Sequence, residues 1–118
     1  MASTRNEAGT QAEDLAAAFL AERGLAIVAR NFRRRCGELD IVARDGDTLV
    51  FVEVRLRRSA RFGGAAESIT AAKRARLCAA AGLYLARLAH TPPCRFDAVL
   101  LDALDPARIR WVRDIVTL

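Results

Sequence analysis

Apolar residues recur along the chain at two different spacings, and these spacings predict an alternation of helices and strands. From about residue 10 to residue 23, leucine, alanine and phenylalanine follow one face of a helix, and Gly24 ends it in the usual C-terminal position. Short apolar, β-branched stretches then predict strands over residues 25–32, 37–43 and 49–56. The polar residues 1–8 are expected to form a flexible tail before a single domain over 9–118.

The second half of the chain continues this alternation. An alanine-rich stretch from about residue 66 to residue 88 predicts a long helix, and Pro92-Pro93 closes that region. Two further stretches, 95–102 and 108–116, predict the last strands. The order α-β-β-β-α-β-β indicates an α/β fold in which the helices pack on one sheet.

Strands 37–43 and 49–56 are predicted to form a hairpin around a polar turn. Residues two apart on a strand share a face, and a loop over 45–48 places Arg44 opposite Leu49 and Asp40 opposite Glu53. One face of this hairpin is then wholly apolar, made by Leu39, Ile41, Ala43, Val50, Val52 and Val54. The other face ends in a charged group made by Glu38, Asp40, Glu53 and Arg55. A slip of one residue would destroy the apolar face, which supports this register.

The two opposed carboxylates point to a definite chemistry. Cross-strand partners have Cβ atoms about 4.5–5.5 Å apart, and carboxylates that close raise each other's pKa unless a cation lies between them. Mg²⁺ or Mn²⁺ suits such oxygen ligands, and it could activate water and stabilise charge on a phosphate. The alternative is a structural network in which Arg55 and nearby arginines neutralise Asp40 and Glu53.

Composition narrows the class of protein. The chain has 118 residues, of which 53% are hydrophobic and 28% charged, as expected for one globular domain. No apolar run is long enough for a membrane span, and the polar N-terminal residues lack the apolar core of a secretory signal. We therefore expect a cytoplasmic protein. The three cysteines form no CxxC pair, so neither a disulfide framework nor a zinc site is indicated.

Positive charge is concentrated around the hairpin. The chain has a net charge of +5, and residues 30–61 hold nine arginines against five acids. A polyanion is the natural partner of such a stretch, whereas the alternative is a solvated basic surface. Two arginine clusters flank the carboxylates and would bind neighbouring phosphates: Arg33, Arg34, Arg35, and Arg57, Arg58, Arg61.

Two segments of the hairpin resemble a known family. Gly37-Glu38-Leu39-Asp40-Ile41-Val42 and Phe51-Val52-Glu53-Val54-Arg55 are similar to the YraN-like family of bacterial proteins, and the similarity extends over about residues 12–116. That family resembles the PD-(D/E)xK nuclease superfamily, with archaeal Holliday-junction resolvases as its closest functional relatives. The resemblance implies a restriction-endonuclease-like α-β-β-β-α-β core, in which helices flank a central mixed sheet, and a DNA partner.

The resemblance also implies roles for individual residues. Asp40 matches the motif aspartate and Glu53 the acid of the E-x-K element, while Glu13 matches a helical acid of the resolvase-like branch. These three residues would hold Mg²⁺ or Mn²⁺, with Glu38 as a further ligand or a support for the ligands.

Arg55 departs from the pattern, because the superfamily has lysine at that position. Arginine can stabilise negative charge but stays protonated in proteins, so it cannot act as a base. Lys73, on the second predicted helix, is a candidate substitute for that lysine and a candidate contact to nucleic acid, although a solvated helix lysine is the commoner case.

Three interpretations follow from these features. The first is a metal-dependent endonuclease in which Asp40, Glu53 and Arg55 act on DNA, in particular branched or damaged DNA. The second is a nucleic-acid-binding module that kept the scaffold and lost efficient cutting, and the third is a basic interaction protein whose acids are structural. A homodimer would suit an enzyme that cuts two strands, but no residue demands one.

Overall fold

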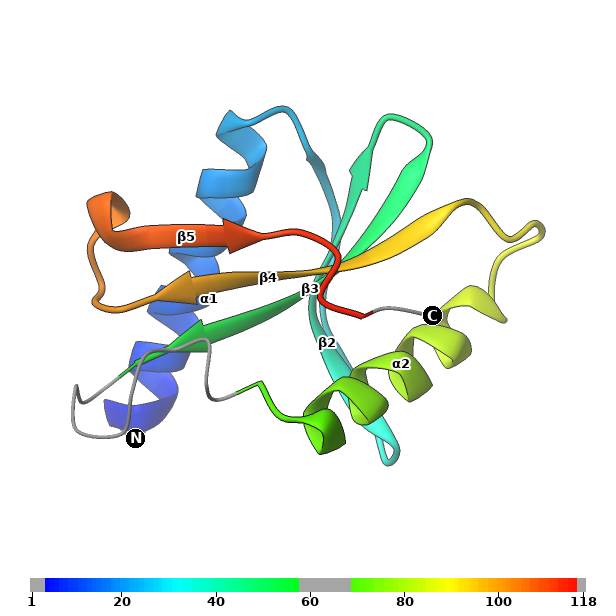
Figure 1. The fold of residues 1–118 in the computed structure, drawn as a ribbon, viewed down its shortest axis with the longest axis horizontal. Helices are drawn as coiled ribbons and strands as arrows, with labels where there is room; N and C mark the ends of the chain where they lie inside the picture. The colour runs from blue at the N-terminus through cyan, green and yellow to red at the C-terminus, as the bar shows by residue number, and fades with distance from the viewer. Residues whose placement is uncertain (1–3, 58–68, 117–118) are drawn as a thin grey trace.

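A five-stranded mixed sheet forms the centre of the fold, with one helix packed on each face (Figure 1). The computed structural model describes residues 4–57 and 69–116. The elements, in chain order, are α1 (Thr4–Glu22), β1 (Ala26–Arg34), β2 (Gly37–Asp45), β3 (Thr48–Leu56), α2 (Ala71–Leu85), β4 (Cys94–Leu101), η3 (Pro106–Arg108) and β5 (Ile109–Val112). This order confirms the predicted α/β class with a helix-strand-strand-strand-helix-strand core.

The strands lie in the sheet in the order in which they occur in the sequence. β1, β2 and β3 form an antiparallel meander, and β4 and β5 are likewise antiparallel. β3 and β4 are parallel, so the chain must cross over between them, and α2 lies within that connection. A sheet with both kinds of pair is mixed, as the family resemblance implied.

The helix ends differ from their predicted positions for local reasons. α1 begins at Thr4 rather than near residue 10, so residues 4–8 of the predicted tail are helical instead. The first three residues of the expected tail lie outside the described residues. α2 begins at Ala71, because the Thr70 hydroxyl oxygen accepts a hydrogen bond from the Lys73 backbone N–H at 3.2 Å. The sequence predicted that this helix begins near residue 66, and residues 66–68 lie outside the described residues.

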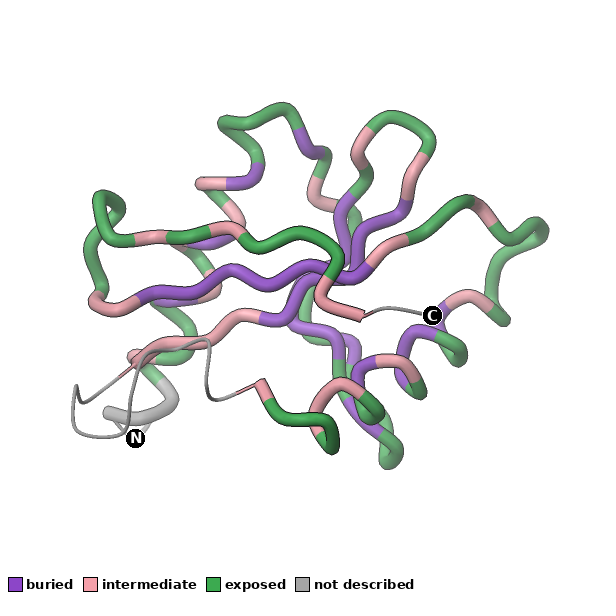
Figure 2. Tube along the Cα trace, viewed as in Figure 1, coloured by how far each residue is buried: buried purple, intermediate pink, exposed green. Residues whose placement is uncertain are grey.

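Two apolar cores hold the helices against the sheet (Figure 2). On one face, α1 packs on the buried residues Ile41, Ala43, Val50, Val52, Val99 and Leu101. On the other face, Leu77, Ala80 and Tyr84 of α2 pack on the aromatic rings of Phe32, Phe51 and Phe96 and on neighbouring aliphatic residues. The central strands β2, β3 and β4 are buried between these two layers, which explains their nearly continuous apolar sequences.

The predicted hairpin register is confirmed from Ile41–Val52 to Arg44–Leu49, although its turn is shorter than expected. Asp45 and Thr48 are also paired, so Gly46 and Asp47 alone make the turn. Gly46 has a φ of 61°. Two-residue hairpin turns need a positive φ at their first central residue, and glycine adopts a positive φ freely.

One residue of the predicted apolar face lies on the other side of the sheet. Leu39 packs in the α2 core, whereas Ile41, two residues later, packs in the α1 core. The opposing strand explains the change, because Asn31 has a φ of 57° and lies between the Cα partners Arg30–Ile41 and Phe32–Leu39. This left-handed residue rotates the pair of strands, and Leu39, Asp40 and Ile41 are all buried in succession.

Candidate functional site

The two opposed acids, Asp40 and Glu53, lie directly beyond the last paired residues of the β2–β3 ladder. Ile41 and Val52 are that last pair, and Asp40 and Glu53 follow them outward on the two strands. Both acids are buried, with 9% and 7% of their surfaces exposed. One carboxylate oxygen of Asp40 accepts a hydrogen bond of 2.8 Å from the Val54 backbone N–H, which fixes its side chain across the hairpin. The two acids therefore lie close together as predicted, although the backbone ladder ends one residue before them.

Burial and mutual repulsion dominate the electrostatics of this pair. Loss of water around Asp40, followed by the negative charge of Glu53, raises the pKa of Asp40 to about 8, and the Val54 N–H only partly opposes this shift. Burial also raises the pKa of Glu53, which the positive charges of Arg55 and Lys73 counteract. The fold thus holds two carboxylates where both charged forms are disfavoured, and a cation between them would relieve the repulsion.

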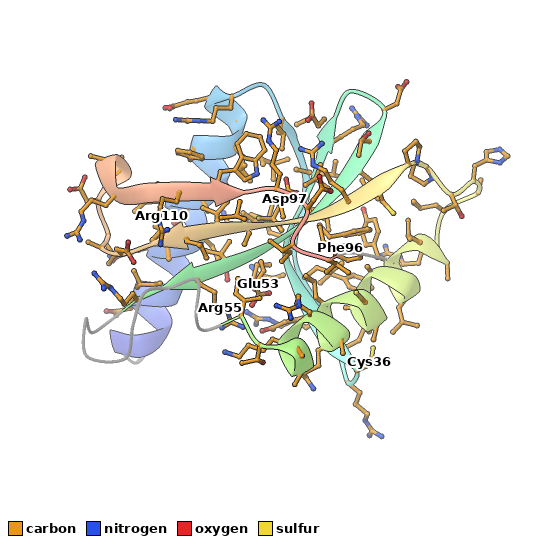
Figure 3. The ribbon with its side chains drawn as sticks, in the orientation of Figure 1. Cys36, Glu53, Arg55, Phe96, Asp97 and Arg110 are labelled. Atoms are coloured by element: carbon orange, nitrogen blue, oxygen red, sulfur yellow. The ribbon has the colours of Figure 1, made fainter. Side chains whose placement is uncertain are left out.

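Arg55 already occupies one side of the pair. Its Nη2 forms a close ion pair with Oε1 of Glu53, and 30% of its side chain is exposed. The Nε of Arg55 is buried and has no hydrogen-bond partner among the described residues. Figure 3 shows Glu53 and Arg55 together on β3, near the start of α2. Arg55 therefore neutralises Glu53 directly.

The other two candidate acids contribute charge from a distance. Glu13 on α1 lies 3.6 Å from Nη2 of Arg30, which also binds Asp14 at 2.8 Å. Glu38 is exposed and binds Nε of Arg33 at 3.3 Å. The charges of Glu13 and Glu38 both raise the pKa of Asp40, so they are electrostatically coupled to the site. Arg30, which sequence reasoning did not single out as a site residue, thus lies near Glu13 but binds Asp14 more closely.

Carboxylate oxygens are the donors that hard divalent cations prefer, and Asp40 and Glu53 supply them side by side. Within residues 4–57 and 69–116, no three His, Cys, Asp or Glu side chains gather as a ready-made metal cage. Mg²⁺ is typically held by one or two carboxylates together with water and substrate phosphates. Two carboxylates therefore fit Mg²⁺ better than an ion that needs a complete protein shell.

The predicted phosphate-binding residues fall into four groups. Arg33, Arg34 and Arg35 are exposed at the β1–β2 turn, where the Arg34 guanidinium lies 4.0 Å from the centre of the Phe32 ring. Arg57 binds Asp102 at 3.4 Å and is thus engaged within the fold. Arg58 and Arg61 lie outside the described residues. Lys73, in the first turn of α2, is close enough for its charge to lower the pKa of Glu53.

Asp97, a further acid of the sheet, has a structural role. It is fully buried and accepts hydrogen bonds from Arg95 Nε at 3.2 Å, Trp111 Nε1 at 2.9 Å and the Asp114 backbone N–H at 3.1 Å. These bonds join β4 to β5 and to the segment that follows β5. The sequence pattern alone left its role open, because the donors come from residues up to 17 positions away.

Comparison with known proteins places the chain among bacterial relatives of similar length. A UPF0102 protein of Nitrosomonas europaea is 51% identical over 114 residues, which are 97% of this chain and 96% of the relative. A UPF0102 protein of Cupriavidus taiwanensis is 54% identical over 111 residues, or 93% of this chain and 82% of the relative. Residues 12–101 match the family described as "Uncharacterised protein family UPF0102". The chain therefore belongs to the UPF0102 family, which is the YraN-like family that its hairpin motifs resemble.

Proposed function

We propose that this protein is a metal-dependent endonuclease that hydrolyses DNA phosphodiester bonds. The observation that carries the proposal is the pair of buried carboxylates, Asp40 and Glu53, held together at the end of the β2–β3 ladder. Burying two acids side by side lowers the stability of a fold, so their presence indicates that their charge serves a function. A purely structural pair could have been replaced by apolar residues, as at neighbouring positions of the same strands.

Mg²⁺ or Mn²⁺ is the cofactor that this donor set fits, with Asp40 and Glu53 as the residues that would hold it. When bound, such an ion neutralises the carboxylates, lowers the pKa of a water molecule and stabilises charge on a phosphate under attack. Glu13 would complete the ligand shell directly or through water, for which it must leave its 3.6 Å contact with Arg30. Glu38 adds negative charge at the rim of the site.

The chain's cations would act on the phosphate. Arg55 lies against Glu53 and can stabilise the extra negative charge that develops on the scissile phosphate. It cannot accept a proton, so Arg55 orients and stabilises rather than acting as a base. Lys73, whose charge reaches Glu53 from α2, is the candidate for the role that lysine plays in the superfamily pattern.

One observation favours a second function, a nucleic-acid-binding module without efficient cutting. Arg55 forms its ion pair with Glu53 in place of a smaller lysine, and this contact competes with a metal ion for the carboxylate. In a binding module, the arginine would be the permanent partner of Glu53. The basic residues around the hairpin would then account for the whole function.

Cleavage of a DNA panel in Mg²⁺ or Mn²⁺ separates the two functions. The panel contains linear duplex, single strand, a flap and a four-way junction, each with an EDTA lane. We expect cutting by the native chain that disappears in EDTA and in Asp40→Asn, a variant that keeps the Val54 hydrogen bond. Asp47→Asn is the matched control, because it makes the same change on the exposed turn of the same hairpin.

Each remaining result has a definite meaning. Cutting by Arg55→Lys but not by the native chain would show that the arginine silences an intact site, in favour of the binding module. Cutting that survives both EDTA and Asp40→Asn would refute the metal-dependent mechanism. If neither the native chain nor Arg55→Lys cuts any substrate, the endonuclease proposal is wrong.

A further inference from the structure

The two helices that cover the sheet carry opposite charge. Residues 7–22 of α1 contain four acids and no lysine or arginine, whereas α2 contains Lys73, Arg74 and Arg76 and no acid. The carboxylate pair lies in the sheet between them. A polyanion is therefore attracted to the α2 side of the molecule more than to the α1 side, where Arg30 already pairs with Glu13 and Asp14.

The β1–β2 turn adds its arginines to the basic side. Gly37, at the end of this turn, packs so closely on α2 that an added Cβ would lie 2.0 Å from the carbonyl oxygen of Arg76. In Figure 3, Cys36, the residue before Gly37, is labelled beside α2. The exposed Arg34 and Arg35 come three and two positions before Gly37 in the chain, so their backbone lies close to this contact.

The Phe32 ring extends this surface toward the end of α2. Phe32 packs edge-on against Tyr84 of α2 at 5.3 Å between ring centres. The guanidinium of Arg34 lies 4.0 Å, and that of Arg87 5.4 Å, from the centre of the Phe32 ring. We call the surface made by Arg34, Arg35, Arg76 and Arg87 the α2 basic face.

The arginines of the α2 basic face differ from most others in having no acidic partner. Arg30, Arg57, Arg95 and Arg110 are each within 4.0 Å of a carboxylate, so their charge is used inside the fold. In the part of the chain that the structure describes, no carboxylate lies that close to any of the four members of the face. Five other described arginines also have no such partner, namely Arg23, Arg44, Arg74, Arg108 and Arg113. Of these, Arg23 and Arg113 lie over the Phe19 and Trp111 rings, and Arg74 donates a hydrogen bond to the Ile69 carbonyl oxygen.

We propose that the α2 basic face is where the phosphate backbone of duplex DNA docks, an inference that rests on the proposed function and adds the direction of approach. Arg76 and Arg87 are eleven positions apart, which corresponds to roughly 16 Å along a helical path. Successive phosphates of one strand are about 3.4 Å apart along the duplex axis, so the face spans several of them. Arg57 takes no part in this surface, because it is bound to Asp102.

The test is the salt dependence of binding, measured without metal so that no cleavage occurs. A fluorescein-labelled linear duplex of about 20 base pairs, roughly two helical turns, is titrated in EDTA at several salt concentrations. The slope of log affinity against log salt reports the number of phosphates neutralised, with about 0.9 per contact. We expect Arg35→Gln/Arg76→Gln to make the slope shallower by about 2. The control Arg23→Gln/Arg108→Gln removes the same charge elsewhere and should leave the slope unchanged.

The outcomes distinguish this inference from the proposed function. The docking face would be refuted if the slope of log affinity against log salt became shallower by the same amount in both double variants. It would also be refuted if the native chain did not bind the duplex at low salt. Tighter binding to a duplex RNA of the same length would refute the choice of DNA. Salt-sensitive binding through this face without metal-dependent cutting would leave the docking face standing and overturn the endonuclease. If the native chain cuts DNA but the salt-dependence slope of Arg35→Gln/Arg76→Gln equals that of the native chain, the endonuclease proposal stands and the docking face is refuted. Thermal melting checks that both double variants are folded.

Discussion

Asp40→Asn tests whether the buried carboxylate pair is held at a cost in stability. The pKa of Asp40 is raised from 3.8 to about 8, chiefly by burial and then by Glu53. Between these values the folded chain keeps a proton that the unfolded chain has released, so the free energy of unfolding must fall as the pH rises through this window. Asparagine cannot titrate, and its side-chain oxygen can still accept the hydrogen bond from the Val54 N–H.

The magnitude follows from the same two values. About 4 pH units at about 1.4 kcal/mol each give an upper bound of about 6 kcal/mol at pH 8. Water penetration and relaxation reduce the cost of burying a charge in real proteins, so we expect Asp40→Asn to gain about 2 kcal/mol at that pH. For a domain of this size, that gain corresponds to a rise in Tm of roughly 8 °C. Below about pH 4 the gain should vanish, because Asp40 is protonated in both states.

Urea unfolding at a series of pH values, followed by circular dichroism, measures this effect directly. The native profile should fall with rising pH, and the Asp40→Asn profile should be flatter, with a residual slope from Glu53, whose pKa is also raised. Asp47→Asn, on the exposed turn, should run parallel to the native chain. Parallel native and Asp40→Asn profiles, or a loss of stability in Asp40→Asn at pH 8, would refute the account of the site.

Two further variants test the packing that positions the site. Gly37→Ala should destabilise the fold by about 3 kcal/mol in urea unfolding, because the new Cβ would meet the Arg76 backbone at 2.0 Å, and a neutral effect would refute the close approach of turn and helix. Asp97→Asn should cost about 3 kcal/mol by the same measurement, because it removes the buried charge that Arg95 and Trp111 bind, and unchanged stability would contradict the structural role of that acid.

The hairpin was predictable in register because its sequence has strong local constraints. Ile41, Ala43, Val50 and Val52 leave one alignment that buries them all on one face, and the structure has that alignment. The same alignment brings Asp40 and Glu53 together, so the centre of the candidate site could be predicted without knowledge of the fold. The side of the sheet on which Leu39 lies could not be predicted in this way, because the left-handed Asn31 on the opposite strand turns Leu39 into the α2 core.

Contacts between distant segments could not be predicted in the same way. Asp102 binds Arg57 although the two residues lie far apart in the sequence, and no local pattern links them. The same holds for Arg30, which holds Glu13 and Asp14 of α1, and for the packing of Gly37 on α2. A cluster of arginines in the sequence therefore predicts a basic protein, but only the fold separates arginines that serve the structure from those that face outward.

The position of the carboxylate pair links the acidic and basic sides of the molecule. A phosphate backbone that docks on α2 approaches the pair from the side of Lys73, whose charge already reaches Glu53. Under the proposed function, phosphate would compete with Glu53 for Arg55, and movement of Arg55 toward the phosphate would leave Glu53 able to bind a metal ion. DNA and metal should consequently favour each other's binding, because the phosphate would take Arg55 as its partner and the metal ion would take Glu53. If the protein is an endonuclease, the Arg55–Glu53 ion pair would then be the resting state of the site, and Arg55 would be compatible with turnover in place of lysine.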